Sequence, residues 1–398
     1  SYDIFDDVKF ISLDEAKEKG LLEIVSSDLD EKFLDVVQTQ QQNPEAVAEV
    51  ADTFKLIYTP FHGTGSRPIK AILNRMGFKN VLVVKEQDTE DGNFPTVKSP
   101  NPEDKEGFEI AIKMAKENDV DVIIGTDPDC DRVGIVVRDA DGIYRTLTGN
   151  QTGALLVEYI LSSKKAKGTL PENGVVIKTI VTTELAAAIA HSYGIEIMNV
   201  LTGFKYIGEK MTEFAKTGDH TYLIGFEESY GYLGGTYVRD KDAVIASMLI
   251  CEMVAFYKAK GLLLTDVLEE LYKKYGYYFC SQKSFTCEGE SGMKRIAGIM
   301  DTLRSETPAE IAGERVVRAD DYEKSVSRNL ENGTESKITL PVSNVLCYYM
   351  ADGSSLIVRP SGTEPKIKLY IGSVGVTEED AIAKRTALEE SGTKLLGF

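Results

Sequence analysis

The chain has 398 residues, a length that predicts two to four domains. Acidic residues outnumber basic ones by 63 to 45, and the resulting net charge of −18 argues against a general nucleic-acid binder. There is no signal-peptide pattern or apolar run of the ~18 residues that a membrane helix needs, and the five cysteines are scattered, so we expect a reduced, cytoplasmic protein that binds neither nucleic acid nor membrane.

Residues 1–50 are charged and helix-prone and show no strand alternation. They are typical of a connector and a helix rather than of the start of a domain. A chain that opens in this way predicts that a first domain precedes it and is absent from the sequence.

Residues 51–148 alternate between strand and helix patterns, which predicts an α/β domain. Asn101 can cap a helix that has Pro102 at its first position. The predicted elements are strand 54–58, helix 67–76, strand 81–84, helix 102–118 and strand 120–126.

Directly after that last strand, Asp127, Asp129 and Asp131 stand at alternate positions, and Arg132 follows. The apolar run 133–137 comes next, so the cluster lies on a tight loop between two strands. Three like charges repel each other unless a cation joins them, and we expect no neutralising lysine beside them. Oxygen ligands select a hard ion. Arginine suits a phosphate. The loop therefore predicts a Mg²⁺–phosphate site, with a solvated acidic turn as the alternative; an EF-hand is excluded by spacing.

Residues 149–276 repeat the alternation, so the sequence predicts two consecutive α/β domains with mainly parallel sheets flanked by helices. In such sheets ligands bind beyond the carboxyl ends of the strands, where the acidic loop lies. The predicted elements are strand 175–181, helix 184–193, strand 195–200, helix 206–216, strand 222–225 and helices 242–258 and 264–275.

Residues 277–398 are richer in strands and predict a smaller α+β C-terminal domain. The polar stretch 320–336 is interpreted as a flexible insertion. The predicted elements are strand 277–286, helix 291–304, strands 316–319, 346–350, 355–358 and 367–372, and helix 378–396.

A short loop between the last two strands has Arg359, Ser361, Gly362 and Thr363. Backbone N–H groups in such a turn can form an anion nest, to which the arginine and the hydroxyls add donors. We predict a phosphate clamp here; an ordinary β-hairpin turn is the alternative, because these residues are common in turns.

Glu227, Glu228 and Ser229 follow strand 222–225 and could bind sugar hydroxyls. The alternative is the N-cap of the next element. Thr202 and Gly203 by themselves indicate only a turn.

Lys205, Arg239 and Lys241 are single basic residues, which by themselves are typical of solvated surface charges. His62 is a lone histidine in a glycine-rich turn, for which a structural role is favoured over a catalytic one.

Taken together, residues 127–132, 202–205, 227–231 and 359–363 resemble, in the same order, four motifs of the α-D-phosphohexomutases, within them the phosphoglucomutase and phosphomannomutase group. The resemblance extends from about residue 50 to the end. Members of the family have three related α/β domains and a smaller C-terminal domain. By this resemblance, residues 51–148 bind metal, residues 149–276 the sugar and residues 277–398 a phosphate.

The resemblance implies an enzyme that passes phosphate from a phosphoserine to a sugar monophosphate and takes the other phosphate back. Asp127, Asp129 and Asp131 would hold Mg²⁺ on the phosphoserine, and glucose 1,6-bisphosphate would be the intermediate and primer. Arg132 and Lys241 would be catalytic. The implied substrate-binding residues are Thr202, Gly203, Lys205, Glu227, Ser229, Arg239, Arg359, Ser361, Gly362 and Thr363.

The sequence departs from the family pattern at two places. First, Pro128 and Cys130 stand between the aspartates, where many members have glycine. Second, the T-A-S-H-N-P-like serine loop of the family's first domain does not occur, and Ser99-Pro100 resembles it only superficially. We therefore expect a phosphoglucomutase that interconverts glucose 1-phosphate and glucose 6-phosphate. We expect its partner to be the missing first domain, and this chain to be inactive without that domain. The alternatives are a phosphomannomutase, a phosphopentomutase or a non-catalytic sugar-phosphate-binding protein.

Overall fold

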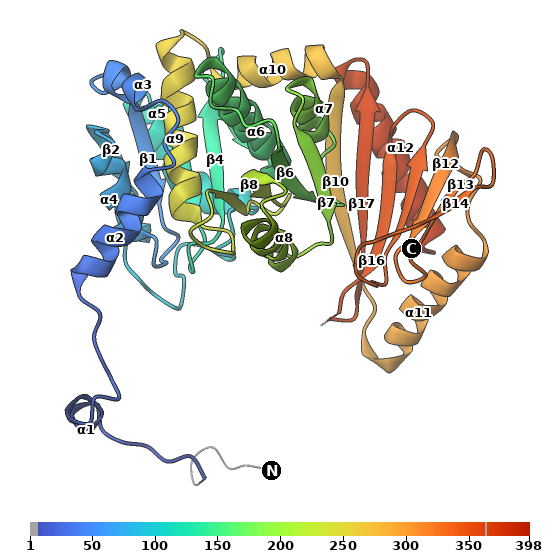
Figure 1. The fold of residues 1–398 in the computed structure, drawn as a ribbon, viewed down its shortest axis with the longest axis horizontal. Coiled ribbons are helices and arrows are strands. Elements are labelled where there is room, and N and C mark those ends of the chain that lie inside the picture. Colours follow the sequence, from blue (N-terminus) through green and yellow to red (C-terminus); the bar gives the residue numbers. More distant parts are fainter. Residues whose placement is uncertain (1–6, 363) are drawn as a thin grey trace.

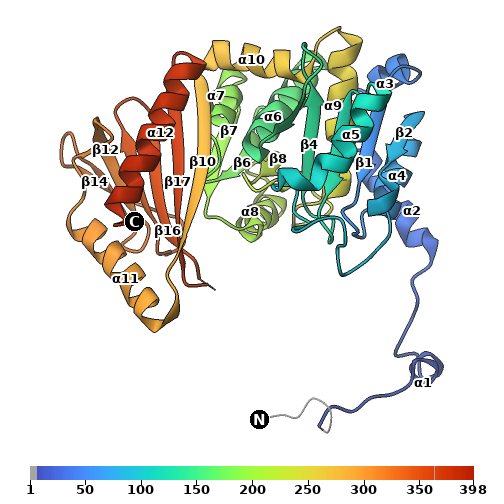
Figure 2. The same cartoon turned by 180° about the vertical axis from the view of Figure 1, so that it is seen from behind.

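The computed structural model describes residues 7–362 and 364–398, which form three sheets placed one after another along the longest axis (Figure 1). α1 (Leu13–Glu18) extends away from this body and buries none of its residues. Helices flank the first two sheets, as the two opposite views show (Figures 1 and 2). No helix in the described part of the chain is both long and apolar enough to cross a membrane.

The first sheet has the order β2-β1-β3-β4-β5, in which β1 pairs in parallel with β2 and β3, and β4 and β5 add antiparallel strands at one edge. All five residues of β3 are buried, because helices pack on both faces of the sheet. Its strands are β1 (Lys55–Thr59), β2 (Asn80–Val83), β3 (Val122–Thr126), β4 (Val133–Arg138) and β5 (Tyr144–Leu147). Its helices are α4 (Ser66–Arg75), α5 (Glu109–Asn118) and the 3-10 turns η1 (Lys85–Gln87) and η2 (Lys105–Phe108).

The helix predicted to begin at Pro102 begins later. The side chain of Asn101 accepts a hydrogen bond from the N–H of Glu103 (2.9 Å) and closes a turn, so it does not cap a helix. Asp104 caps η2 instead, by accepting from the N–H of Glu106 (3.0 Å).

The second sheet has the order β7-β6-β8-β9, with β6 parallel to β7 and β8 and with β9 antiparallel. Its strands are β6 (Gly174–Thr179), β7 (Glu196–Val200), β8 (Thr221–Phe226) and β9 (Tyr232–Gly234). Its helices are α6 (Gly149–Ala166), α7 (Leu185–Ser192), α8 (Phe204–Thr217), α9 (Ala243–Ala259) and α10 (Leu264–Tyr275). The sequence reading missed α6, although Thr148 and Gln151 form a capping box at its start.

The first two sheets share one hydrophobic core, because α9 is buried along nearly its whole length and contacts both. α2 (Ser27–Gln38) and α3 (Pro44–Val50) pack on α4 and α9. The buried carboxylate of Glu252 accepts the N–H groups of Gln42 (2.7 Å) and Asn43 (3.0 Å) and the hydroxyl of Tyr159 (2.8 Å). Residues 27–50 are therefore part of the core.

The third sheet is antiparallel, in the order β10-β17-β16-β15-β12-β13-β14, with β11 paired to β12. α12 (Glu378–Leu395) packs across β17, and α11 (Gly289–Ser305) also belongs to this unit (Figure 2). The strands are β10 (Tyr277–Thr286), β11 (Glu310–Ile311), β12 (Glu314–Asp321), β13 (Val326–Asn329), β14 (Glu335–Lys337), β15 (Leu346–Met350), β16 (Ser355–Pro360) and β17 (Lys366–Gly375).

The interpretation of residues 320–336 as a flexible insertion is wrong. The stretch forms β13 and the start of β14, which continue the sheet from β12. Cross-strand pairs fix it, among them Arg328 with Glu335 (2.8 Å) and the Ser327 hydroxyl donating to Asp320 (2.5 Å). Charged residues that alternate on an edge hairpin have the same composition as a disordered segment.

Candidate functional site

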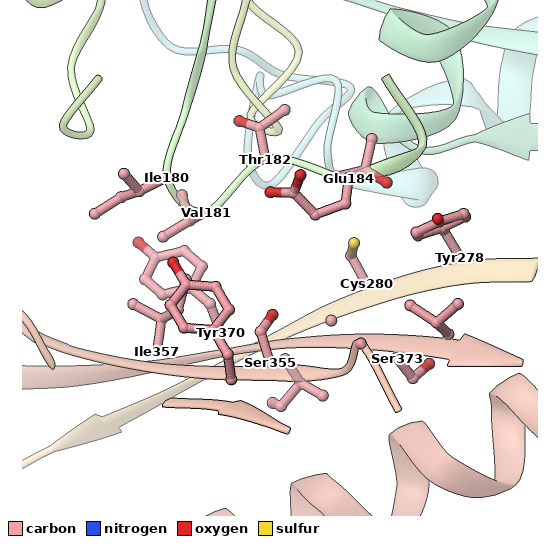
Figure 3. Close-up of a pocket in the computed structure, with 16 residues that line it drawn as sticks. Ile180, Val181, Thr182, Glu184, Tyr278, Cys280, Ser355, Ile357, Tyr370 and Ser373 are labelled. Carbon is pink, nitrogen blue, oxygen red and sulfur yellow. The ribbon is translucent and has the colours of Figure 1, made fainter. Parts of the chain in front are cut away.

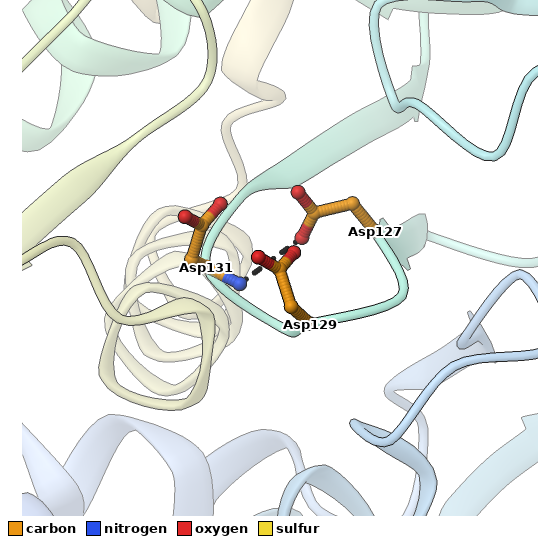
Figure 4. Close-up of side chains that lie close together, drawn as sticks. All are labelled: Asp127, Asp129 and Asp131. Carbon is orange, nitrogen blue, oxygen red and sulfur yellow. Dashed lines mark hydrogen bonds between the residues drawn. The ribbon is translucent and has the colours of Figure 1, made fainter. Parts of the chain in front are cut away.

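The acidic loop connects β3 to β4 at the carboxyl end of β3. Asp127, Asp129 and Asp131 each offer an oxygen, and these oxygens all lie within 4.8 Å of one another (Figure 4). One oxygen of Asp127 accepts the backbone N–H groups of Asp131 (3.0 Å) and Arg132 (2.9 Å), which closes the loop. The structure thus brings the three predicted ligands together.

A second turn, residues 60–65, supports this loop from outside. Thr64 donates both its backbone N–H and its hydroxyl to the carbonyl of Pro128, each at 2.9 Å. A Cβ on Gly63 would lie 2.3 Å from the Cα of Pro128, so only glycine allows this approach. On the other side, the carbonyl of Cys130 accepts the N–H of Ala243 (3.0 Å), and Cys130 itself takes a left-handed conformation (φ 57°).

His62 anchors the supporting turn. Its Nδ1 lies 3.0 Å from the carbonyl oxygen of Thr89, and its Nε2 lies 2.8 Å from the hydroxyl of Thr96. Both ring nitrogens are engaged and the residue is buried, as the structural interpretation of this histidine requires.

The charges of the acidic loop are only partly balanced. Burial raises the pKa of Asp127 to about 7; the N–H of Arg132 opposes this, and the charges of Asp131 and Asp129 add to it. Nζ of Lys241 lies 2.6 Å from Asp131, so the expectation that no lysine neutralises the cluster is wrong: the lysine comes from the loop before α9. Burial tends to lower the pKa of Lys241, but the contact with Asp131 raises it overall.

A divalent cation fits the remaining acceptors. One oxygen of Asp131 is buried and has no hydrogen-bond partner among the described residues, which is unfavourable unless a ligand reaches it. Arg132 lies close but contacts several carboxylates at once. Its Nη1 is 3.2 Å from Glu103, and its Nε is 3.7 Å from Asp131 and 3.9 Å from Asp127. Three carboxylates in one tight loop form an oxygen donor set for a hard ion such as Mg²⁺.

A cavity of ≈ 600 Å³ opens beside the acidic loop, and residues of all three sheet units line it. Backbone contacts join the acidic loop to residues 230–231, which follow the glutamate pair. Arg132 forms a β-bridge with Gly231, and the N–H of Val133 donates to the carbonyl of Tyr230 (3.1 Å). The predicted site residues that line the cavity are Arg132, Thr202, Gly203, Glu227, Ser229, Lys241 and Arg359.

Glu227 connects two of the predicted loops. Its carboxylate accepts the N–H of Gly203 (2.8 Å), and burial raises its pKa. Glu228 accepts the hydroxyls of Thr179 (3.3 Å) and Thr182 (3.2 Å). No helix begins here, because the chain continues into β9, so the N-cap alternative does not apply.

The loop between β16 and β17 is a local hairpin. The N–H of Ser361 donates to the carbonyl of Lys366 (2.8 Å), and the N–H of Glu364 donates to the hydroxyl of Ser361 (3.2 Å). Arg359 reaches the cavity, with Nη1 at 3.5 Å from the hydroxyl of Tyr370. Ser361 and Gly362 are not among the residues that line the cavity, and the predicted Thr363 lies outside the described residues.

Three family models match the chain in order. The models are phosphoglucomutase/phosphomannomutase alpha/beta/alpha domain II at residues 31–142, alpha/beta/alpha domain III at residues 148–275 and the C-terminal domain at residues 303–389. The chain belongs to the phosphoglucomutase/phosphomannomutase family.

Curated relatives within this family support the assignment. The chain is 39% identical over 317 residues to a phosphoglucomutase of Staphylococcus haemolyticus, covering 80% of this chain and 57% of the relative. It is 37% identical over 370 residues to a phosphoglucomutase of Staphylococcus epidermidis, covering 93% of this chain and 65% of the relative. The chain therefore spans less than two thirds of the length of these relatives.

A solved structure shares the fold of this family member. Parafusin (phosphoglucomutase) from Paramecium, in its open form, aligns with a TM-score of 0.66 at 16% identity over 92% of this chain and 62% of parafusin.

Besides Ser361 and Gly362, two further predicted substrate residues of this family member lie outside the cavity lining. Arg239 donates to the hydroxyl of Thr212 (3.1 Å) and to the carbonyls of Thr236 (2.6 Å) and Val238 (3.0 Å). Lys205 lies over the ring of its neighbour Tyr206 (Nζ 4.9 Å from the centroid). Both basic groups have protein partners, and neither is among the described residues that line the cavity.

Sequence reasoning missed several residues that line the cavity, among them Glu103, Asn150, Gln282, Lys368 and Tyr370. Lys368 had a readable signal: it pairs with Arg359 across the hairpin, and residues that pair directly lie on the same face of a sheet. Glu103 had none, because its contact with Arg132 joins two separate loops.

Proposed function

We propose that this chain forms the metal, sugar and phosphate sites of a Mg²⁺-dependent phosphohexose mutase that interconverts glucose 1-phosphate and glucose 6-phosphate. The observation that carries the proposal is the single cavity in which Arg132, Glu227, Lys241 and Arg359 meet beside the aspartate cluster. The relatives named phosphoglucomutase support this substrate class. The metal, sugar and phosphate roles belong to residues 51–148, 149–276 and 277–398, respectively.

The acidic loop serves the phosphoryl group in transfer. Asp127, Asp129 and Asp131 would hold Mg²⁺, which neutralises charge on that group when bound. Arg132 donates to its oxygens with a planar fork. Charged Lys241, 2.6 Å from Asp131, is placed to donate a proton to the sugar oxygen that exchanges the phosphate. The neutral amine left by that donation takes the proton back when the other oxygen is phosphorylated.

The remaining residues orient the sugar phosphate. Glu227 and Ser229 accept and donate hydrogen bonds to sugar hydroxyls, with Thr202 and Gly203 completing that wall. Arg359 holds the phosphate that is not being transferred, together with Ser361, Gly362 and Thr363. Lys205 and Arg239 contribute after side-chain rearrangement on binding.

The reaction also needs a nucleophile that stores the phosphoryl group between two sugar oxygens. We infer that polypeptide outside these 398 residues supplies it as a phosphoserine and that glucose 1,6-bisphosphate is the intermediate and primer. The matched models are those of domain II, domain III and the C-terminal domain, which is consistent with this division of labour.

The test is conversion of glucose 1-phosphate to glucose 6-phosphate with Mg²⁺ and glucose 1,6-bisphosphate. It is run on this chain alone and on the chain fused to the N-terminal segment of the Staphylococcus epidermidis relative that precedes the matched region. We expect turnover only from the fusion. Turnover by the short chain that is lost in Ser99→Ala would show that the nucleophile is Ser99.

Two further arms separate the alternatives. Mannose 1-phosphate and ribose 1-phosphate replace the glucose ester in the same assay, and faster turnover of either would change the assignment to phosphomannomutase or phosphopentomutase. Binding of glucose 1-phosphate without turnover by either protein would favour the non-catalytic binding protein.

A further inference from the structure

A second, smaller cavity of ≈ 150 Å³ lies where the second and third sheet units meet. Its walls come from the start of α6, from α10, from β10 and from α12. Figure 3 shows the adjacent part of this junction, where Thr182 and Glu184 face Cys280 and Tyr278. The residues that line the cavity include Thr148, Asn150, Gln151, Thr183, Tyr272 and Arg385.

Arg385 is the charged member of this lining, and its side chain is partly buried. Its Nε is buried without a hydrogen-bond partner, and it makes no ion pair within residues 7–362 and 364–398. Its neighbour Lys384, in contrast, contacts Asp352 (3.1 Å) and Asp380 (3.6 Å). A buried donor of a charged group without an acceptor is destabilising, and native structures satisfy such groups with ligand, ion or water.

The opposite wall presents donors. The side-chain oxygen of Asn150 accepts the N–H of Thr183 (2.9 Å), which leaves the NH₂ end of that amide as the donor. Tyr272 accepts from Gln151 (3.2 Å), and burial raises the pKa of its hydroxyl, so its own proton stays available. Asn150 also stands in the first turn of the 18-residue α6, whose N-terminal dipole favours an anion.

Two acidic groups near the cavity are engaged elsewhere, and the charge of a third, Glu378 at the start of α12, acts on Tyr272. Glu184 lies 2.8 Å from Nζ of the fully buried Lys178. Glu269 accepts the hydroxyl of Tyr277 (2.7 Å). The described residues that line the cavity include no aspartate or glutamate, so Arg385 supplies the charge of the lining itself.

We propose that this cavity is an anion site for a small tetrahedral oxyanion, which the guanidinium of Arg385 and the donors of Asn150 and Tyr272 hold. Pockets for drug-sized ligands have volumes of about 300 Å³ or more, and this cavity is smaller. A complete sugar phosphate therefore does not fit inside it. An anion here joins α12 of the third unit to α6 and α10 of the second. Asn150 also lines the 600 Å³ cavity, so the two sites share a wall.

The test separates this site from the substrate cavity. Phosphate, sulfate and methyl phosphate are titrated calorimetrically into an Arg359→Ala chain in metal-free buffer at constant ionic strength. We expect binding to persist in that background and to weaken roughly tenfold or more in Arg359→Ala/Arg385→Gln, because a bidentate charge-assisted contact is lost. Lys394→Gln, which removes an exposed cation from the same helix, is the matched control and leaves binding unchanged.

Tyr272→Phe and Arg385→Lys serve as milder variants if Arg385→Gln does not fold. Each is expected to weaken binding severalfold, since one loses a hydroxyl and the other keeps the charge but loses the fork. Equal binding of phosphate with and without these substitutions, or no binding in the Arg359→Ala background, would overturn the proposal. Binding of phosphate and sulfate but not methyl phosphate identifies the occupant as a free anion; tighter binding of methyl phosphate identifies it as the phosphate group of an ester.

Discussion

The acidic loop at residues 127–132 and the hairpin at residues 359–366 are both tight loops between two strands, but they are held differently. The acidic loop is fixed from outside, by Thr64 on one side and by Ala243 of the second unit on the other. The hydrogen bonds found in the described part of the hairpin run mostly within it. Two reach other residues: the N–H of Cys287 donates to the carbonyl of Pro365 (2.8 Å), and Nη1 of Arg359 donates to the hydroxyl of Tyr370 (3.5 Å).

The difference separates two kinds of residue. Metal ligation depends on three oxygens held within a short distance, so residues that never touch the ion should control its affinity. Phosphate binding by a local hairpin depends on the donors themselves, so their neighbours should matter less. Substitutions around each loop can break or sharpen this contrast.

Gly63→Ala should have the largest effect. The new Cβ would lie 2.3 Å from the backbone of Pro128, so the acidic loop must move, and such overpacking costs about 1–3 kcal/mol. We expect Mg²⁺ affinity to fall roughly a hundredfold, measured by calorimetry in the presence of phosphate. Gly92→Ala, where a Cβ meets nothing within 4 Å, is the control and should leave the affinity unchanged.

Arg359→Ala tests the hairpin. Losing its bidentate contact should weaken binding of glucose 1-phosphate roughly tenfold or more, since a hydrogen bond to a charged group contributes about 1.5–3 kcal/mol. Arg328→Ala removes another arginine of the third unit, one paired with Glu335 away from the cavity. Equal dissociation constants for wild type and Arg359→Ala would mean that the hairpin is an ordinary turn.

The acidic loop should also carry a pH dependence. Because burial raises the pKa of Asp127 to about 7, Mg²⁺ must displace a proton at lower pH. Affinity should be constant above about pH 7 and fall about tenfold per pH unit below it.

For the metal-free chain, the same pKa shift predicts that stability falls, rather than rises, with increasing pH. Because the pKa of Asp127 is higher in the folded state than in the unfolded state, Asp127 adds to the free energy of unfolding. This contribution is complete below about pH 4 and is lost as the pH rises towards 7. Mg²⁺ titrations and urea unfolding at several pH values check both slopes. A flat Mg²⁺ profile that Asp127→Asn does not alter would contradict the assignment.

Thr64→Val is the smallest expected effect. It removes the hydroxyl that donates to Pro128 but keeps the shape and the backbone N–H bond, so we expect Mg²⁺ affinity to fall severalfold, in line with about 0.5–1.5 kcal/mol per hydrogen bond. Thr64→Ser keeps the hydroxyl and should restore binding. An equal loss in both variants would indicate that packing, not the hydrogen bond, supports the loop.

Contacts within one loop could be predicted from the sequence, whereas contacts between separate units could not. The three aspartates were readable because all of them stand in one loop between two apolar strands. The pairing of Lys241 with Asp131 was not, because it joins two units and depends on how α9 docks between them. The fold was predicted for the same local reason, and the stretch 320–336 was misread because a charged edge hairpin has no apolar alternation.

The most direct test of the central claim is a titration of Mg²⁺, with phosphate present, into wild-type chain, Asp129→Asn and the exposed control Asp301→Asn. The account predicts weak but saturable binding of one ion by wild type and by the control, because the proposed phosphoserine would add a further ligand that the three aspartates do not provide. It predicts a loss of roughly tenfold or more in Asp129→Asn, which removes one charged ligand. Equal binding by all three proteins would show that the acidic loop is not the metal site.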